Sequence, residues 1–546
     1  MELWLLVLAA GLAASIGFAH RYKMNPDALS YLEVGESWWR GDFSNAVNGY
    51  WSPLFPILIA GIAKLSPNRF TELIPIHFLQ AALVVAAFLA FRWFARCAEE
   101  RASGGRGCDD ESRLNFYLAA YAVFFWACFC LMDIGEILPD LLLTIWLLLA
   151  GGTALRLEGK GNRAAFALGF YLALGYLSKP VMFPLGLIFI VCSVGAVKPL
   201  GKALRLGSLA VVIFLGTSAL YIIPLSLQKH RATFSDSGRL AYAWEVNRIS
   251  PYFHWHGEPI GSGAALHPTG QILDFPPVFE FDRGRPGTYP LWYDASYWNE
   301  GLRPALRVGD QLTRLGKSTS FYVALLQQPV PVILIFSFLL AGTSAGWSAF
   351  FKCGRHFLPL ALISFAAFGL YALVYVISRY LAPFLIFLAI PALATLHHLA
   401  AFSSPVQRLW ARIFALFAGV YVVAVGGFSI AHGLFGHGSA SYSVHARVAH
   451  ELQDLGVKPG DKIGVIGVGC YSYFARLLGV QITAEALVLD GHPVWPASRE
   501  NLEKITSAIA AKTRVSAIVS SVAPGALEGW HVVPGTPYCI WIIKKS

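Results

Sequence analysis

The sequence predicts a polytopic α-helical membrane protein with about eleven transmembrane helices and a small C-terminal α/β domain. Of the 546 residues, 56% are hydrophobic and only 14% are charged, whereas soluble domains carry about 25% charged residues. Long apolar stretches recur along the chain, which excludes disorder and a coiled coil. Basic residues gather in alternate connections between these stretches, as they do in multi-pass membrane proteins.

Eleven apolar segments approach the roughly 20 residues that a transmembrane helix needs. The first has Glu2 as its only charge, so it lacks the basic amino-terminal region of a cleaved signal peptide and is expected to be retained. The predicted helices lie near residues 1–19, 72–94, 114–132, 138–155, 164–178, 181–197, 206–227, 328–350, 357–377, 380–400 and 410–432.

Lys and Arg clusters predict which side of the membrane each connection occupies. One side holds 15 basic and 7 acidic residues, a net charge of +8, out of +10 for the whole chain. Basic residues favour the cytoplasmic side, so residues 20–71, 228–327 and 433–546 are expected outside. A nucleic-acid-binding protein would gather its charge on one soluble face, so no nucleic-acid partner is expected. We expect a bacterial inner-membrane protein embedded in the lipid bilayer.

The segment from Pro53 to Leu65 is the exception in this count. Its 13 residues are too few to span a membrane and favour an interfacial or re-entrant helix. With this segment outside, residues 1–432 form the transmembrane domain, with outer loops 20–71 and 228–327. Residues 433–546 form an extracytoplasmic α/β domain.

The tail alternates short apolar stretches with helical patterns. Strands are expected at 462–466, 515–522 and 532–543, and helices at 471–478 and 497–511. The run Gly467-Val468-Gly469 resembles the start of a dinucleotide fingerprint. Because Ser472 stands where the third glycine would be, a packing or partner-binding role is favoured.

Two cysteines, Cys470 and Cys539, fall in this outer domain. An oxidising periplasm favours a disulfide between them, which would close a loop of about seventy residues and add about 4 kcal/mol. The alternative is a pair of buried free thiols that behave as small apolar side chains.

Asp27 is the leading candidate for chemistry on the outer side. Asn25-Pro26 is a helix-start signal, so Asp27 lies in the first turn of a short helix that runs to Trp39. A carboxylate there either favours the helix dipole or acts as a general base.

Several segments together resemble the GT-C glycosyltransferases, related to the protein O-mannosyltransferases and the lipid A aminoarabinose transferase. Asp27 is followed by Ala-Leu-Ser-Tyr and then by a Pro-Leu-Phe-Pro re-entry. The other matching segments, in the expected order, are Glu136 to Leu143, Gly175 to Pro180 and Ser378 to Pro383. Many members place Glu after the first-loop Asp. Here Ala28 follows, which weakens the case for a metal-chelating acidic pair; no cofactor is assigned, and a divalent metal stays an alternative.

The resemblance implies a role for each candidate residue. Asp27 would be the catalytic base, and the cations Lys179 and Arg379 would bind the donor phosphate. Acceptor binding or support would come from Tyr31, Glu136, Asp140 and Tyr380. For the cations the alternative is snorkelling at a helix end, and for the two carboxylates it is a salt bridge or a helix N-terminus.

The long loop 228–327 is rich in aromatic residues. Their ring planes suit sugars or isoprenoid chains, although an aromatic belt or loop core is the simpler interpretation for any one of them. His254 and His256 stand two residues apart, but no carboxylate at a suitable spacing supports a metal site. The aromatic side chains are Trp244, Tyr252, Phe253, His254, Trp255, His256, Trp292, Tyr293, Tyr297 and Trp298.

The resemblance implies transfer of a sugar from a polyprenyl-phosphate donor to a periplasmic lipid, glycan or protein acceptor. The acceptor would attack with inversion at the anomeric carbon while Asp27 takes its proton. A transporter or flippase of lipid-linked sugars is the rival interpretation, but such proteins often show internal repeats, and none is visible here. A non-catalytic membrane scaffold that displays the tail is a third.

The charge distribution makes the topology testable. A reporter enzyme fused after Ser546 should report a periplasmic location, because the basic clusters hold the alternate connections in the cytoplasm. A second fusion within residues 97–112 should report the cytoplasm. A cytoplasmic signal from the C-terminal fusion would overturn the assignment of sides.

Overall fold

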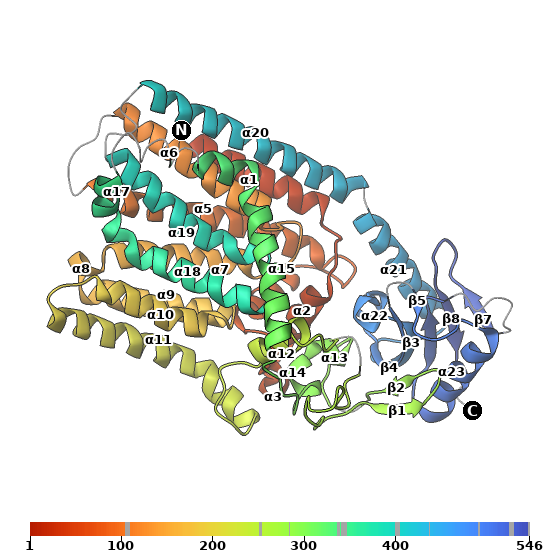
Figure 1. Ribbon diagram of the computed structural model, residues 1–546. Coiled ribbons are helices and arrows are strands. Elements are labelled where there is room, and N and C mark those ends of the chain that lie inside the picture. Colours follow the sequence, from red (N-terminus) through yellow and green to blue (C-terminus); the bar gives the residue numbers. More distant parts are fainter. Residues whose placement is uncertain are drawn as a thin grey trace. The chain divides into compact units, whose positions relative to one another are not determined.

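The structure is a computed structural model that forms two compact units. One, the helical unit, comprises Met1–Ala19, Phe78–Phe234 and Leu306–Ala431, and the other, the sheet unit, comprises His20–His77, Ser235–Ala305 and His432–Ser546 (Figure 1). The described residues are 1–103, 110–250, 254–282, 284–335, 339, 347–398, 405–435, 437–489, 492–522 and 529–543.

Helices make up the helical unit, and α9 packs against α7, α10 and α11. Figure 1 shows these helices running alongside one another. The helices are α1 (Glu2–Ala19), α5 (Leu73–Ser103), α6 (Asp110–Trp126), the π-helical η1 (Ala127–Leu131), α7 (Asp140–Leu155), α8 (Leu157–Lys160), α9 (Asn162–Ser178), α10 (Met182–Gly195), α11 (Leu200–Gln228), α15 (Val308–Leu326), α17 (Trp347–Gly354), η2 (Arg355–Phe357), α18 (Leu358–Val374), α19 (Ser378–His398) and α20 (Pro405–Phe435).

Seven helices within the described residues are long and apolar enough to cross a membrane. The number is eight if Val308–Leu326 and Pro329–Ile335, which are bent by 77° relative to each other, form one span. On α11 the side chains of Val212, Leu220 and Leu227 are 64%, 76% and 70% exposed. Such surfaces suit lipid rather than water. The multi-pass architecture is therefore supported, and the predicted count of about eleven is not confirmed.

Helix α15 corrects the sequence interpretation, which assigned residues 308–326 to an outer loop. Its polar residues kept it out of a search for apolar stretches, and two of them bond to backbone carbonyls of α18. Ser318 Oγ donates to Ala372 O (2.9 Å) and Tyr322 Oη to Phe368 O (2.7 Å). The predicted helix at 328–350 is described only in part: Pro329–Ile335 is helical, and residues 336–338 and 340–346 lie outside the described residues.

Ion pairs join the helix ends that the charge rule assigned to the cytoplasm. Their position fixes the direction of α7, whose 16 residues span about 24 Å. Arg156 follows the last residue of α7, so Asp140, the first residue, lies at the opposite end. The pairs are Arg92–Glu2 (2.8 Å), Arg96–Glu2 (3.0 Å), Arg101–Glu158 (3.3 Å), Arg113–Glu99 (2.9 Å), Arg156–Glu100 (2.6 Å) and Arg412–Glu111 (2.8 Å).

The sheet unit combines short helices with an eight-stranded sheet. Its helices are α2 (Pro26–Trp39), α3 (Phe43–Ala46), α4 (Leu54–Ala63), α12 (Ser237–Glu245), α13 (Pro290–Tyr293), α14 (Ala295–Trp298), α21 (His437–Asp454), η3 (Gly469–Tyr471), α22 (Phe474–Leu478) and α23 (Arg499–Lys512). Its strands are β1 (Gly270–Leu273), β2 (Val278–Glu280), β3 (Lys462–Gly467), β4 (Gln481–Leu489), β5 (His492–Pro493), β6 (Ala517–Ser520), β7 (Trp530–Val532) and β8 (Cys539–Ile542).

The sheet has the strand order β1-β2-β4-β3-β6-β8-β7, with β5 beside β4. Strands β4, β3 and β6 are parallel, and the flanking strands are antiparallel. The structure adds β4, which the sequence interpretation missed, and divides the predicted strand 532–543 into the hairpin β7–β8. Strands β1 and β2 come from the loop 228–327, so the folded unit extends beyond the expected boundary at residue 433.

Both faces of the central strands are buried, as parallel strands require. Along β3, Ile463 and Val465 join a core formed with α21 and α22, whereas Ile466 joins a second core formed with α23. Helices α2 and α4 pack closely, since a Cβ at Gly35 would overlap the Pro56 carbonyl. The ten residues of α4 match the short, non-spanning helix expected within Pro53 to Leu65.

A buried guanidinium ties together distant parts of the sheet unit. Arg476 of α22 is 1% exposed, and its Nε and Nη2 donate to the two carboxylate oxygens of Glu72 at 2.9 and 2.8 Å. It also pairs with Glu36 and lies 3.7 Å from Glu33, both on α2. Glu33 in turn accepts the backbone N–H (3.0 Å) and hydroxyl of Thr288. The Arg476 guanidinium therefore links the C-terminal tail to the segment 20–71 directly, and to the loop 228–327 through Glu33.

These contacts shift the pKa values of the charged groups. Burial opposes the positive charge of Arg476, but Glu72 and Glu36 hold its pKa well above the usual range. Burial raises the pKa of Glu33 despite the nearby guanidinium. For Glu36, burial is outweighed by Arg476, Arg69 and Arg40, which together hold its pKa below the usual value.

Removing the guanidinium should therefore destabilise the sheet unit. Arg476→Ala leaves buried carboxylates without their cation, which costs about 3–5 kcal/mol of unfolding free energy. Urea unfolding followed by tryptophan fluorescence measures the loss. The control Arg499→Ala removes an exposed pair with Glu503 one helical turn away and should change stability by less than about 1 kcal/mol. Equal shifts in the two variants would contradict the structural role of Arg476.

Candidate functional site

In the helical unit, two cations converge on one buried carboxylate. Lys179 Nζ lies 2.7 Å from Asp140 Oδ1, and Arg379 Nε lies 3.7 Å from Asp140 Oδ2. The Asp140 side chain is 7% exposed, and those of Lys179 and Arg379 are 16% and 25% exposed. Lys179 Nζ also lies 3.6 Å from the centroid of the Tyr380 ring. We call these four residues the Asp140 cluster.

Three helix ends position the Asp140 cluster. Asp140 is the first residue of α7, Lys179 caps the C-terminus of α9, and Arg379 and Tyr380 lie in the first turn of α19. Ser378 Oγ donates to Leu131 O (3.0 Å), which fastens the start of α19 to the end of η1. The Tyr380 ring stacks on Tyr371 of α18 at 5.1 Å.

A polar residue within α5 fixes the turn that precedes α7. Gln80 is buried, and its Nε2 donates to the carbonyls of Glu136 (3.1 Å) and Leu138 (3.0 Å). The side chain of Glu136 is half-buried. Sequence analysis did not single out Gln80. The available signal was an uncharged but strongly polar side chain inside an apolar helix, which is costly unless it has partners.

The charges of the Asp140 cluster favour an anion. Two cations face one carboxylate, which gives a formal net charge of +1. Helices α7 and α19 both begin here, and helix N-termini carry partial positive charge and unsatisfied N–H groups. Arg and Lys both bind phosphate, Arg with a planar fork of donors. The arrangement is suited to a phosphate group.

In the sheet unit, Asp27 lies where the sequence predicts, in the first turn of α2. Asn25 Oδ1 accepts the Ala28 N–H at 2.6 Å and caps the helix, with Pro26 in the first position. The cap therefore does not depend on Asp27. One oxygen of its carboxylate, Oδ1, accepts the indole N–H of Trp292 at 3.1 Å.

Tyr31, one turn further along α2, is buried rather than open to a ligand. Its ring packs edge-on against Trp51 at 4.6 Å and Phe55 at 5.2 Å. The expected acceptor role of Tyr31 stays a prediction, and its visible contribution is to pack α2 against the segment that leads into α4.

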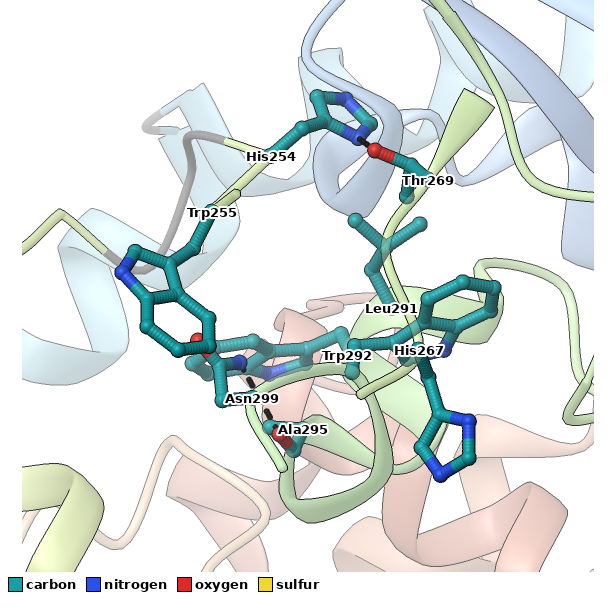
Figure 2. Close-up of a pocket in the computed structure, with 9 residues that line it drawn as sticks. His254, Trp255, His267, Thr269, Leu291, Trp292, Ala295 and Asn299 are labelled. Carbon is teal, nitrogen blue, oxygen red and sulfur yellow. Dashed lines mark hydrogen bonds between the residues drawn. The ribbon is translucent and has the colours of Figure 1, made fainter. Parts of the chain in front are cut away.

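A pocket opens beside Trp292 within the loop 228–327 (Figure 2). It encloses about 340 Å³ of space not filled by atoms, part of it open to solvent. In Figure 2 the imidazole of His254 is turned toward Thr269, and Asn299 Nδ2 donates to Ala295 O (3.0 Å). The lining residues are His254, Trp255, His267, Thr269, Leu291, Trp292, Ala295, Trp298 and Asn299.

The two histidines of the sequence analysis share a hydroxyl partner. His254 Nδ1 and His256 Nε2 each lie 3.0 Å from Thr269 Oγ1. His254 Nε2 also lies 3.2 Å from Glu485 Oε2, and burial lowers the His254 pKa despite this carboxylate. Among the described residues, no three His, Cys, Asp or Glu side chains are grouped so as to hold a metal ion. Tyr252 and Phe253, which belong to the same aromatic set, lie outside the described residues.

The glycine-rich turn after β3 is occupied by protein. The Gly469 N–H donates to Glu485 Oε1 at 2.6 Å, and a Cβ at Gly469 would overlap the Tyr289 ring. A carboxylate thus stands where a dinucleotide-binding turn would receive phosphate, which supports the packing interpretation. Cys470 and Cys539 are both free thiols. Burial, with Glu485 and then Asp27 nearby, raises the Cys470 pKa well above its usual value.

The structure thus brings together Asp140, Lys179, Arg379 and Tyr380 in the helical unit, and places Asp27 and Tyr31 on one helix of the sheet unit. Sequence analysis selected all six residues. A salt bridge was its alternative for Asp140, and the structure shows that salt bridge with both cations. It did not foresee that an indole N–H binds Asp27.

Comparison with known proteins places the fold. No protein-family model matches the chain, and no curated protein sequence matches it. Among solved structures, ArnT from Cupriavidus metallidurans bound to undecaprenyl phosphate matches with a TM-score of 0.50 and 13% identity, over 100% of this chain and 98% of that one. The apo ArnT structure matches with a TM-score of 0.51 and 14% identity, over 98% and 97%.

An oligosaccharyltransferase from Archaeoglobus fulgidus, solved with a tethered acceptor peptide, matches at a TM-score of 0.46 and 12% identity, over 95% of this chain and 69% of that one. ArnT, the lipid A aminoarabinose transferase, and this oligosaccharyltransferase are both GT-C glycosyltransferases. The resemblance stated from the sequence motifs is confirmed at the level of the fold: the chain has the fold of ArnT along nearly its whole length.

Proposed function

We propose that the chain is a membrane glycosyltransferase that moves a sugar from a polyprenyl-phosphate donor to a periplasmic lipid, glycan or protein acceptor. The observation that carries this proposal is the Asp140 cluster, in which two cations lie beside one buried carboxylate. The fold adds support, because ArnT shares it and was solved with undecaprenyl phosphate bound.

Lys179 and Arg379 would bind the phosphate of the donor. As the bond between the anomeric carbon and the phosphate oxygen breaks, negative charge grows on that oxygen, and the cations stabilise it. Asp140 holds both cations in place before the donor arrives, so little reorganisation is needed. The products are the glycosylated acceptor and the polyprenyl phosphate.

Asp27 would act as the general base. The acceptor hydroxyl or amine attacks the anomeric carbon from the face opposite the phosphate, with inversion, and its proton passes to the Asp27 carboxylate. A carboxylate is suited to this step because it accepts a proton and has no proton of its own to lose at neutral pH.

A transfer assay separates this function from transport. Purified protein in liposomes, incubated with radiolabelled polyprenyl-phosphate sugars and candidate acceptors, should release polyprenyl phosphate and label the acceptor. A flippase would move the labelled lipid between leaflets and leave the sugar–phosphate bond intact. Movement without cleavage, across a panel of donors and acceptors, would contradict the proposal.

The base assignment is tested by Asp27→Asn. The amide can still accept the Trp292 N–H but cannot take up the proton, so transfer should fall by about 100-fold or more while the protein stays folded. The control Asp42→Asn changes another outer-segment aspartate, which caps α3, and should keep activity. Normal turnover by the Asp27 variant would leave that residue no catalytic role.

The phosphate assignment is tested by Arg379→Ala. Loss of this cation should weaken donor use by about 10- to 100-fold, seen in kcat/KM for the donor, because charge-assisted contacts are among the stronger polar interactions. The matched control is Arg412→Ala, which removes an arginine paired with Glu111 at the opposite helix ends. Equal kcat/KM in the two variants would count against a phosphate site at Arg379.

A further inference from the structure

We infer that Trp292 is a positioning residue for Asp27: its indole N–H fixes the orientation of the carboxylate. The inference rests on the proposed function, in which Asp27 is the base. Its foundation is the hydrogen bond from Trp292 Nε1 to Asp27 Oδ1 at 3.1 Å, which joins residues 265 positions apart in the chain.

The backbone of Trp292 is held by α2 and by the segment before α4. Its carbonyl accepts the Ser30 hydroxyl at 3.0 Å and the Trp51 indole N–H at 3.1 Å. Ser30 lies one helical turn after Asp27, so α2 grips Trp292 at two points, through the side chain and through the carbonyl. The donor and its acceptor therefore keep a fixed relation to each other.

The indole ring of Trp292 is held by aromatic neighbours as well. It stacks on Trp244 at 5.8 Å with an interplanar angle of 27°, and lies 6.0 Å from Trp51 and 5.9 Å from Tyr50. Rotation of the ring would break these contacts and remove the N–H from Asp27. The aromatic residues of the loop thus aim one donor, a role that the sequence pattern alone did not distinguish from a general aromatic core.

The chemistry of indole suits orientation rather than proton transfer. The N–H donates but has no acceptor capacity and does not ionise at working pH, so it cannot compete for the acceptor's proton. By binding Oδ1 it holds the carboxylate in one orientation. It also favours the charged form of the carboxylate, which is the form a base requires.

Two other indoles of the same pocket use their N–H groups differently. Trp255 donates to Glu258 O (2.9 Å) and Ser262 Oγ (3.1 Å), and Trp298 donates to Pro290 O (2.9 Å). These bonds hold the loop together. Trp255 therefore offers a matched control, since Trp→Phe removes one indole N–H from the same pocket (Figure 2) without touching Asp27.

The experiment compares Trp292→Phe, Trp255→Phe and Asp27→Asn in the transfer assay across pH. Trp292→Phe should lower kcat by about 10- to 100-fold, because a misplaced base loses much of its effect, and should leave the donor KM unchanged. The acidic limb of its pH–rate profile should move to higher pH, since the charged carboxylate has lost a donor. Trp255→Phe should keep the parent kcat and profile.

A purely structural role would lower the amount of active enzyme without moving the pH profile. The Cys470 thiol is a titratable group whose charge would be felt by Asp27. Because burial holds its pKa well above the usual value, it does not ionise in the acidic pH range where the profile is compared. If Trp292→Phe does not fold, Ser30→Ala provides the test. It removes the hydroxyl that binds the Trp292 carbonyl, so the acidic limb of the pH–rate profile should move in the same direction by a smaller amount.

The outcomes separate the inference from the function beneath it. An inactive Asp27→Asn together with a Trp292→Phe variant of parent kcat and pH profile would overturn the positioning role and leave the base assignment standing. Parent activity in Asp27→Asn would overturn both, because Trp292 would then have no base to position.

Discussion

Compensation of buried charge organises both units of this protein. In the helical unit one carboxylate, Asp140, holds two cations, and in the sheet unit one guanidinium, Arg476, holds three carboxylates. Each arrangement leaves an excess of one sign in a buried place, where charge is costly. The excess cation of the first favours an incoming anion. In the second, burial raises the pKa of Glu33, which favours its neutral form and reduces the excess negative charge.

The sequence was a good guide to helices and to single residues. Apolar length located most membrane helices, and the Asn25-Pro26 signal predicted α2 to the residue, because capping chemistry is local. The same reasoning failed for α15, whose Ser318 and Tyr322 find their hydrogen-bond partners on α18. It also failed for β4, and it overlooked the hairpin β7–β8, although Pro534-Gly535 marks the turn between these two strands.

The candidate site shows the same division between local and distant information. Asp27, Lys179 and Arg379 could be selected because each stands beside a helix end that the sequence marks. A salt bridge of Asp140 was only one alternative from the sequence, and the bond between Asp27 and Trp292 was not predicted, because packing brings together residues that lie far apart in the chain. Only the fold specifies which carboxylate a cation meets and which donor a carboxylate receives.

The pairing of β2 with β4 has a consequence for how the protein is made. Strand β2 belongs to a loop that is synthesised roughly 200 residues before its partner, so until β4 is made β2 has an unpaired edge. Such edges invite aggregation, and chains with distant pairings fold slowly. Folding of the sheet unit is therefore completed only when β4 has been synthesised, and a chain shortened before β4 would leave β2 without its partner strand.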